Sequence, residues 1–169
     1  MINLIKLAGI IMIFSAASMT GAYLSASLHQ RCIRLETLRR MTEDIASYIR
    51  YRELTVYEIV QELSANSFYK DFDFVRCLIR NLDRHRPFYS QWEMAVDECR
   101  LKGDERDFIL SLGNVLGTSD TQGQLAAIEL YSAKLDSMIK ASDEQYSRKG
   151  KLYRSLGVLS GAMLGILML

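Results

Sequence analysis

The apolar residues of this chain are segregated into two uncharged ends and a middle segment where they recur with helical spacing. Residues 7–28 carry no charge, and neither do residues 155–169. An uncharged run of about 20 residues is long enough to cross the hydrocarbon core of a bilayer as a helix. The pattern predicts an N-terminal transmembrane helix within residues 1–29, a helical domain over residues 30–154, and a C-terminal transmembrane segment over residues 155–169.

The C-terminal segment is short for a membrane span. Its fifteen residues reach about 22 Å, whereas the hydrocarbon core measures about 30 Å. Leu152 and Tyr153 extend the apolar run, and the guanidinium of Arg154 can reach the headgroups, so the deficit can be closed. The alternative is a buried C-terminal core helix, although such a helix in a small soluble domain should carry a polar face.

A cleaved export signal is the alternative for residues 7–28, with Ser25 and Ser27 as the small residues of the cleavage site. The apolar run is longer than the usual signal core, only Lys6 precedes it, and the dense positive charge follows it. These features favour a retained helix.

Small residues recur every fourth position in both uncharged segments, and a stripe of this kind lets two helix backbones approach closely in lipid. The stripes consist of Ala17, Gly21 and Ser25 in the first segment and Gly157, Gly161 and Gly165 in the second. We therefore expect these faces to be packing surfaces within the membrane.

The middle segment shows helical periodicity and no sustained alternation of the kind that marks a strand. From Gln30 to Arg52 the expected buried stripe is Leu38, Met41, Ile45, Tyr48 and Ile49. This first helix should continue directly out of the membrane. The predicted fold class is all-α, a helical bundle domain between an N-terminal and a short C-terminal transmembrane helix.

Capping and turn residues divide the rest of the domain. Thr55 and Glu58 predict a capping box for a second helix that runs to about Ala65. The further predicted boundaries are a cap at Asp71, a first turn at Pro87 with a helix end near Gly103, and a cap at Asp104. The expected inward residues of these three helices are Phe72, Val75, Leu78, Ile79 and Leu82; Phe88, Trp92, Ala95, Val96 and Cys99; and Phe108, Ile109, Leu112 and Val115.

Residues 112–124, with the sequence LGNVLGTSDTQGQ, predict a corner between two helices. Gly117 is placed to end the fifth helix in the left-handed conformation. Ser119 and Gln122 predict the next capping box. The last helix should then run through Leu125, Ile128, Tyr131, Leu135, Met138 and Ile139 into the membrane.

Charge changes the picture in two ways. Residues 41–147 contain twelve basic and nineteen acidic residues, a net charge of about −7, whereas a nucleic-acid-binding domain should be basic. Bases instead form two collars beside the uncharged segments: Arg31, Arg34, Arg39 and Arg40, and Arg148, Lys149, Lys151 and Arg154. Because basic flanks prefer the cytoplasmic side of a membrane, the domain is predicted to be cytoplasmic.

Catalytic and cofactor-binding patterns are absent from the sequence, which has no phosphate-binding loop, zinc-protease or nucleophile-elbow motif. His29 lies at the membrane border and His85 in an arginine-flanked turn, and neither has a Ser or Cys partner at a spacing that supports a triad. Cys32, Cys77 and Cys99 lack metal-ligand spacing, and their odd number fits a reducing compartment. We predict no catalytic residue, no cofactor and no metal site.

Two carboxylate pairs could in principle perform acid/base chemistry: Asp71 with Asp73, and Asp104 with Asp107. Helix N-termini attract acidic residues in any case, so capping is the favoured interpretation. A membrane-bound enzyme with an unrecognised acidic site is the alternative to a non-enzymatic protein.

Two segments resemble the stage III sporulation protein AB family of endospore-forming bacteria. The segment KLYRSLGVLSG, residues 151–161, resembles the C-terminal part of that family. The second is an LGxxLGxSD segment with a glutamine four residues after the aspartate, formed by Leu112, Gly113, Leu116, Gly117, Ser119, Asp120 and Gln124. The likeness covers the whole layout from the first anchor to the last.

The resemblance implies a protein without activity of its own in the channel complex between mother cell and forespore, similar in role to the inner-membrane platform proteins of type II secretion and type IV pilus machines. It implies as partners a cytoplasmic secretion-type ATPase, stage III sporulation protein AA, and other membrane components of the complex. The implied location is the mother cell membrane. Our hypothesis for partner binding is the corner, at Gly117, Ser119, Asp120 and Gln124.

Overall fold

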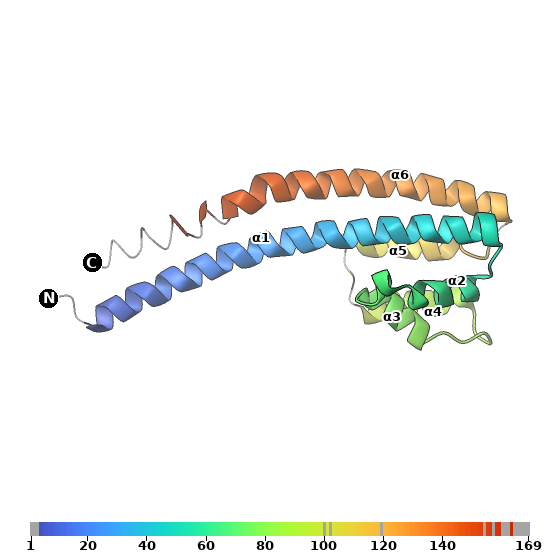
Figure 1. Ribbon diagram of the computed structural model, residues 1–169, viewed down its shortest axis with the longest axis horizontal. Helices are drawn as coiled ribbons and strands as arrows, with labels where there is room; N and C mark the ends of the chain where they lie inside the picture. Colours follow the sequence, from blue (N-terminus) through green and yellow to red (C-terminus); the bar gives the residue numbers. More distant parts are fainter. Residues whose placement is uncertain are drawn as a thin grey trace. The chain divides into compact units, whose positions relative to one another are not determined.

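A computed structural model shows an all-helical chain over the residues that it describes, which are 4–99, 101, 103–118, 120–153, 155–156, 158–159 and 163 (Figure 1). The α-helices are α1 (Leu4–Ser47), α2 (Val56–Ala65), α3 (Asp73–Arg80), α4 (Phe88–Glu98), α5 (Gly103–Val115) and α6 (Thr121–Gln145). Short π or 3₁₀ turns lie at η1 (Tyr48–Arg52), η2 (Ser67–Tyr69) and η3 (Tyr146–Gly150). The all-α prediction is confirmed for this part of the chain.

Contacts divide the chain into two compact units. The core unit is Leu35–Ser137, and the terminal unit combines Met1–Arg34 with Met138–Leu169. Helices α1 and α6 each contribute residues to both units.

The part of α1 within the core unit buries a continuous apolar stripe. Four of the five residues predicted for it are at most 5% exposed: Leu38, Met41, Ile45 and Ile49. Tyr48 is only half-buried, and Leu35 extends the stripe by one turn. Thr42 lies within this buried face because its hydroxyl donates to the Leu38 carbonyl at 2.8 Å.

Helix α2 begins as its capping box predicts. The Glu58 N–H donates to the Thr55 hydroxyl oxygen at 3.4 Å, and the Glu58 carboxylate accepts from the Thr55 N–H at 2.8 Å. The helix ends at Ala65, as expected.

The predicted cap of the third helix is wrong. Helix α3 begins at Asp73, and Phe72, not Asp71, lies at its N-cap position. The reason is the 3₁₀ turn η2, whose hydrogen bonds continue through Phe72 N–H to the Tyr69 carbonyl at 2.9 Å. Tyr69 is buried and donates its hydroxyl to Asp44 at 2.6 Å, so a tertiary contact holds this turn and delays the helix.

The next three boundaries also differ from the predictions. Pro87 takes the N-cap position of α4, one residue before the first turn, and α4 ends at Glu98, before the expected end near Gly103. Helix α5 begins at Gly103, whose φ is +58°, and Asp104 therefore lies inside its first turn. Acidic residues stabilise this turn through the helix dipole without acting as the cap.

Aromatic rings hold α3, α4 and α5 together. Trp92 contacts Phe74 with a 4.8 Å separation of ring centroids and Phe88 with a 5.6 Å separation. The indole N–H donates to the Ile109 carbonyl on α5 at 2.7 Å. The predicted core residues Phe108, Ile109 and Leu112 are fully buried around this cluster.

The terminal unit pairs α1 with the returning helix in antiparallel fashion, as Figure 1 shows. Contacts join Ser25 to Gly150, His29 to Tyr146 and Cys32 to Ser142, so residue numbers rise along one helix and fall along the other. Cys32 Sγ and Ser142 Oγ are 3.2 Å apart and buried.

Among the described residues, no helix combines the length and the apolar character that crossing a membrane requires. Gly157, Gly161 and Gly165 of the predicted C-terminal membrane segment lie outside the described residues. The two transmembrane helices therefore remain a prediction.

Candidate functional site

The corner between α5 and α6 is closed by its own hydrogen bonds. Gly117 adopts φ +76°, as predicted, and turns the chain after the last residue of α5. Its N–H donates to the side-chain carbonyl of Gln124 at 3.2 Å. Two of the residues expected to bind a partner thus contact each other across the corner.

Asp120 caps the last helix. Because α6 begins at Thr121, Asp120 occupies the N-cap position, and its carboxylate accepts from the Gly123 N–H at 3.2 Å. The predicted capping box, with its cap at Ser119, is therefore wrong by one residue. Ser119 itself lies outside the described residues.

The remaining residues of the corner motif face the core. Leu112 and Leu116 are at most 3% exposed. A Cβ atom at Gly113 would lie 2.3 Å from Cδ1 of Trp92, so only a residue without a side chain fits there. Nothing in the local spacing of the motif indicates this contact, because Trp92 is far away in the sequence.

Small residues of α1 line a groove within the terminal unit. Ala17 and Gly21 lie on one wall, and the opposite wall includes Leu156 and Leu159. The groove has a volume of about 530 Å³, and its lining is predominantly apolar. Gly21 is buried. The structure thus brings the first small-residue stripe to the C-terminal segment.

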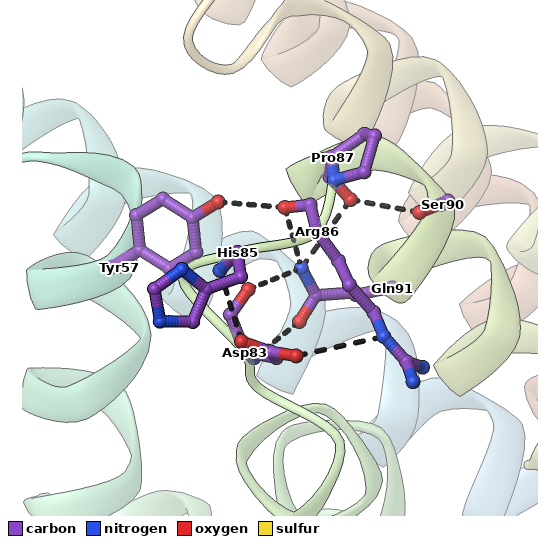
Figure 2. Close-up of polar contacts among 7 residues, drawn as sticks. All are labelled: Tyr57, Asp83, His85, Arg86, Pro87, Ser90 and Gln91. Carbon is purple, nitrogen blue, oxygen red and sulfur yellow. Dashed lines mark hydrogen bonds and ion pairs between the residues drawn. The ribbon is translucent and has the colours of Figure 1, made fainter.

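A buried glutamine anchors the loop between α3 and α4 (Figure 2). Gln91 is 1% exposed, and its side-chain carbonyl accepts from the Asp83 N–H at 2.5 Å. Its side-chain NH₂ group lies 2.8 Å from the Asp83 carbonyl, 3.0 Å from the Arg86 carbonyl and 3.3 Å from the Pro87 carbonyl. One side chain thereby binds backbone groups of three residues of the loop, Asp83, Arg86 and Pro87.

Further contacts complete this loop. The Tyr57 hydroxyl donates to the Arg86 carbonyl at 3.0 Å, as Figure 2 shows. The Asp83 carboxylate accepts from the His85 N–H at 2.9 Å and pairs with Arg86 Nε at 3.5 Å. The side chains of Arg84, His85 and Arg86 point into solvent from this fixed backbone. Sequence reasoning placed His85 in an arginine-flanked turn but missed the anchor, because Gln91 looks like an ordinary polar position of an amphipathic helix.

The three thiols are free. Burial, followed by a hydrogen bond with Cys77, raises the pKa of the Cys99 thiol to about 12, which leaves it unreactive at neutral pH. Within the described ranges, no three His, Cys, Asp or Glu side chains gather in an arrangement that could hold a metal ion.

The fold and these surfaces define a class: a small helical domain whose first and last helices extend into an antiparallel pair. The family described as stage III sporulation protein AB matches residues 6–169 of the chain. The chain belongs to the stage III sporulation protein AB family, which gives it a role in sporulation.

A curated relative supports this assignment. Stage III sporulation protein AB of Bacillus subtilis (strain 168) is 22% identical over 171 residues, which cover 98% of this chain and 100% of the relative. No solved structure matches the chain.

Proposed function

We propose that this protein is a non-enzymatic, membrane-anchored component of the channel complex between mother cell and forespore, and that it docks a cytoplasmic secretion-type ATPase to membrane partners. Its family membership supports a part in sporulation. The proposal places the core unit in the cytoplasm of the mother cell, where such an ATPase is accessible.

The observation that carries this proposal is the continuity of α1. One helix runs from Leu4 to Ser47 and includes both the uncharged residues 7–28 and the buried core residues Leu35, Leu38, Met41 and Ile45. A helix that is apolar at one end and contributes to the core unit at the other suits a protein that connects a membrane component to a soluble one.

Side-chain accessibility determines how the topology should be tested. Cys32 is buried, and the raised pKa of Cys99 lowers its thiolate fraction, so these two cysteines report exposure poorly. A Ser64→Cys variant in a background without the native cysteines places a thiol on an exposed position of α2. We expect a membrane-impermeant maleimide to label it only after cells are permeabilised. Labelling of intact cells would contradict the cytoplasmic location and favour an exported protein.

The docking proposal is tested at the corner. A photo-crosslinking residue at the exposed positions Thr118 or Gln122 should capture stage III sporulation protein AA, identified by a specific antibody, in sporulating cells. The same residue at the exposed position Ser64 provides the matched control. Equal capture at all three positions, or capture at none of them while sporulation proceeds normally, would contradict docking through the corner.

The membrane interface has its own variant. Gly161→Leu fills the expected small-residue stripe, so it should release membrane partners while leaving the unfolding of the core unit unchanged. Copurification of membrane components with the full chain and urea unfolding are the two measurements. Undiminished assembly with this variant would show that the stripe is no interface.

Loss of sporulation from single Asp or Glu changes that preserve folding and binding would favour an enzyme instead.

A further inference from the structure

Three neighbouring side chains form an exposed basic tip on the α3–α4 loop: Arg84, His85 and Arg86. The corner proposed for docking the ATPase does not include them. Gln91 and Tyr57 hold the backbone at Asp83 and Arg86, on either side of Arg84 and His85 (Figure 2). The three side chains of the basic tip are exposed, and packing of the core does not account for them.

The described arginines of the core unit are mostly neutralised by local carboxylates. Ion pairs of this kind join Arg39 to Glu43 and Asp136, Arg52 to Glu62, Arg76 to Asp73, Arg80 to Glu98, Arg86 to Asp83 and Arg106 to Asp97. Within the part of the chain that the structure describes, the Arg84 and His85 side chains form no such pair.

The carboxylate of Glu58 interacts electrostatically with Arg84 but accepts its hydrogen bonds from Thr55. Glu58 lies near enough for Arg84 to contribute to lowering its pKa, but the larger causes are the hydrogen bonds from the Thr55 hydroxyl and N–H. The Glu58 carboxylate therefore accepts hydrogen bonds within the capping box of α2, and among the described residues it forms no ion pair with Arg84.

The fixed backbone makes the basic tip suited to binding. Ordering a mobile loop costs conformational entropy at every residue, and a partner that binds such a loop has to offset that cost. Here Gln91 and Tyr57 hold the backbone of Asp83, Arg86 and Pro87 before any partner arrives. An electrostatic contact at the tip therefore does not have to offset the ordering of these backbone groups.

The net negative charge of the core unit bears on which kind of partner can bind at the tip. Between Leu35 and Ser137 the sequence has thirteen basic and eighteen acidic residues. An acidic surface is repelled by most of the core unit. At the tip it meets the guanidinium of Arg84, which forms no ion pair among the described residues, whereas Arg86 is paired with Asp83. We propose that the basic tip is a docking site for an acidic segment of a protein partner.

Two other anionic partners fit the tip less well. Anionic membranes are recognised by clusters of about four to eight Lys or Arg residues, which the basic collars supply and the tip does not. Nucleic-acid binding needs a basic working surface with many phosphate contacts, and the acidic balance of the core unit opposes it.

The test uses the full chain in nanodiscs and a fluorescent oligoglutamate peptide as the probe, with binding followed by fluorescence anisotropy. Arg84→Glu should weaken binding about tenfold or more, because like charges then face each other. Arg50→Glu is the matched control, since Arg50 is another exposed arginine that forms no ion pair among the described residues; its effect should stay within about twofold. Equal losses in both variants, or no binding by the unmodified chain, would overturn the proposal.

Two further measurements separate the alternatives. Gln91→Ala keeps every charge of the tip but releases its backbone, so peptide binding should weaken while urea unfolding still shows a folded chain. Retention of full affinity by this variant would overturn the role assigned to the fixed loop. If Arg84→Glu abolishes binding to phosphatidylglycerol vesicles but leaves peptide binding intact, the tip recognises lipid and the protein assignment is wrong.

Discussion

The indole ring of Trp92 occupies the space in which a side chain at position 113 would stand. A Cβ atom at Gly113 would lie 2.3 Å from Cδ1 and 2.4 Å from Nε1 of Trp92. The same indole donates its N–H to the Ile109 carbonyl, one helical turn before Gly113. A hydrogen bond therefore holds α5 against α4, and the absence of a side chain at Gly113 lets the two helices approach this closely.

Gly113→Ala should destabilise the core unit by about 1–3 kcal/mol, the usual penalty for overpacking a core. The added methyl group meets a buried ring that also loses its hydrogen bond if it moves. Urea unfolding of the full chain, followed by circular dichroism, measures the loss. In a Trp92→Leu background the same substitution should cost clearly less, because the two positions are coupled; equal costs in both backgrounds would refute the contact.

Gly117→Ala should lower the free energy of unfolding by about 1–2 kcal/mol, because a residue with a Cβ is strained at positive φ. The φ angle is +76°, and the new Cβ would also lie 3.2 Å from Cγ1 of Val56. Gly117→Asn is the comparison, since asparagine tolerates the left-handed conformation better. An alanine variant as stable as the asparagine variant would argue against a conformational origin.

Gln91→Leu should cost about 1–3 kcal/mol, because it leaves part-buried hydrogen-bonding groups of the loop backbone without their partner. The affected groups include the N–H and carbonyl of Asp83. Amide hydrogen exchange should become faster at Asp83 but not along α2. Gln61→Leu, on an exposed position of α2, should leave both stability and exchange nearly unchanged.

Glu58→Gln should change how stability depends on pH. Hydrogen bonds from Thr55 hold the pKa of Glu58 below its ordinary value of 4.5, so protonation is harder in the folded chain. The resulting stability is present above pH 4.5 and is lost as the pH falls through the folded pKa. Unfolding at pH 7 and at pH 3 should show the variant weakened at the higher pH and closer to the unmodified chain at the lower one. A constant difference between them would contradict this.

Some boundaries were predictable because their causes are local. Thr55 and Glu58 are three residues apart and satisfy each other's backbone N–H groups, so the start of α2 follows from the sequence. The start of α3 does not, since Tyr69 is held by Asp44, twenty-five residues away. Aspartate is a favourable N-cap residue, but the contact between Tyr69 and Asp44 moves the start of α3 beyond Asp71.

The candidate surfaces divide in the same manner. The corner around Gly117 was found because its motif is contiguous, although its cap proved to be Asp120. The basic tip was visible as an arginine-flanked histidine, but its anchor at Gln91 was not. A buried glutamine and an exposed one look alike in a helical pattern, and only the packing of α4 distinguishes them.

The sequence by itself determined the all-helical class, the apolar stripe of α1, the capping box of α2 and the left-handed turn at Gly117. Each depends on interactions within a few residues or on a repeating period, which the linear order records directly. Three contacts were decided by the tertiary structure alone. They are the packing of Trp92 against Gly113, the anchoring of the loop by Gln91, and the contact of Cys32 on α1 with Ser142 on the antiparallel helix α6. These contacts join residues from different elements, and their free energy depends on how closely the backbones approach in space, which no local spacing specifies.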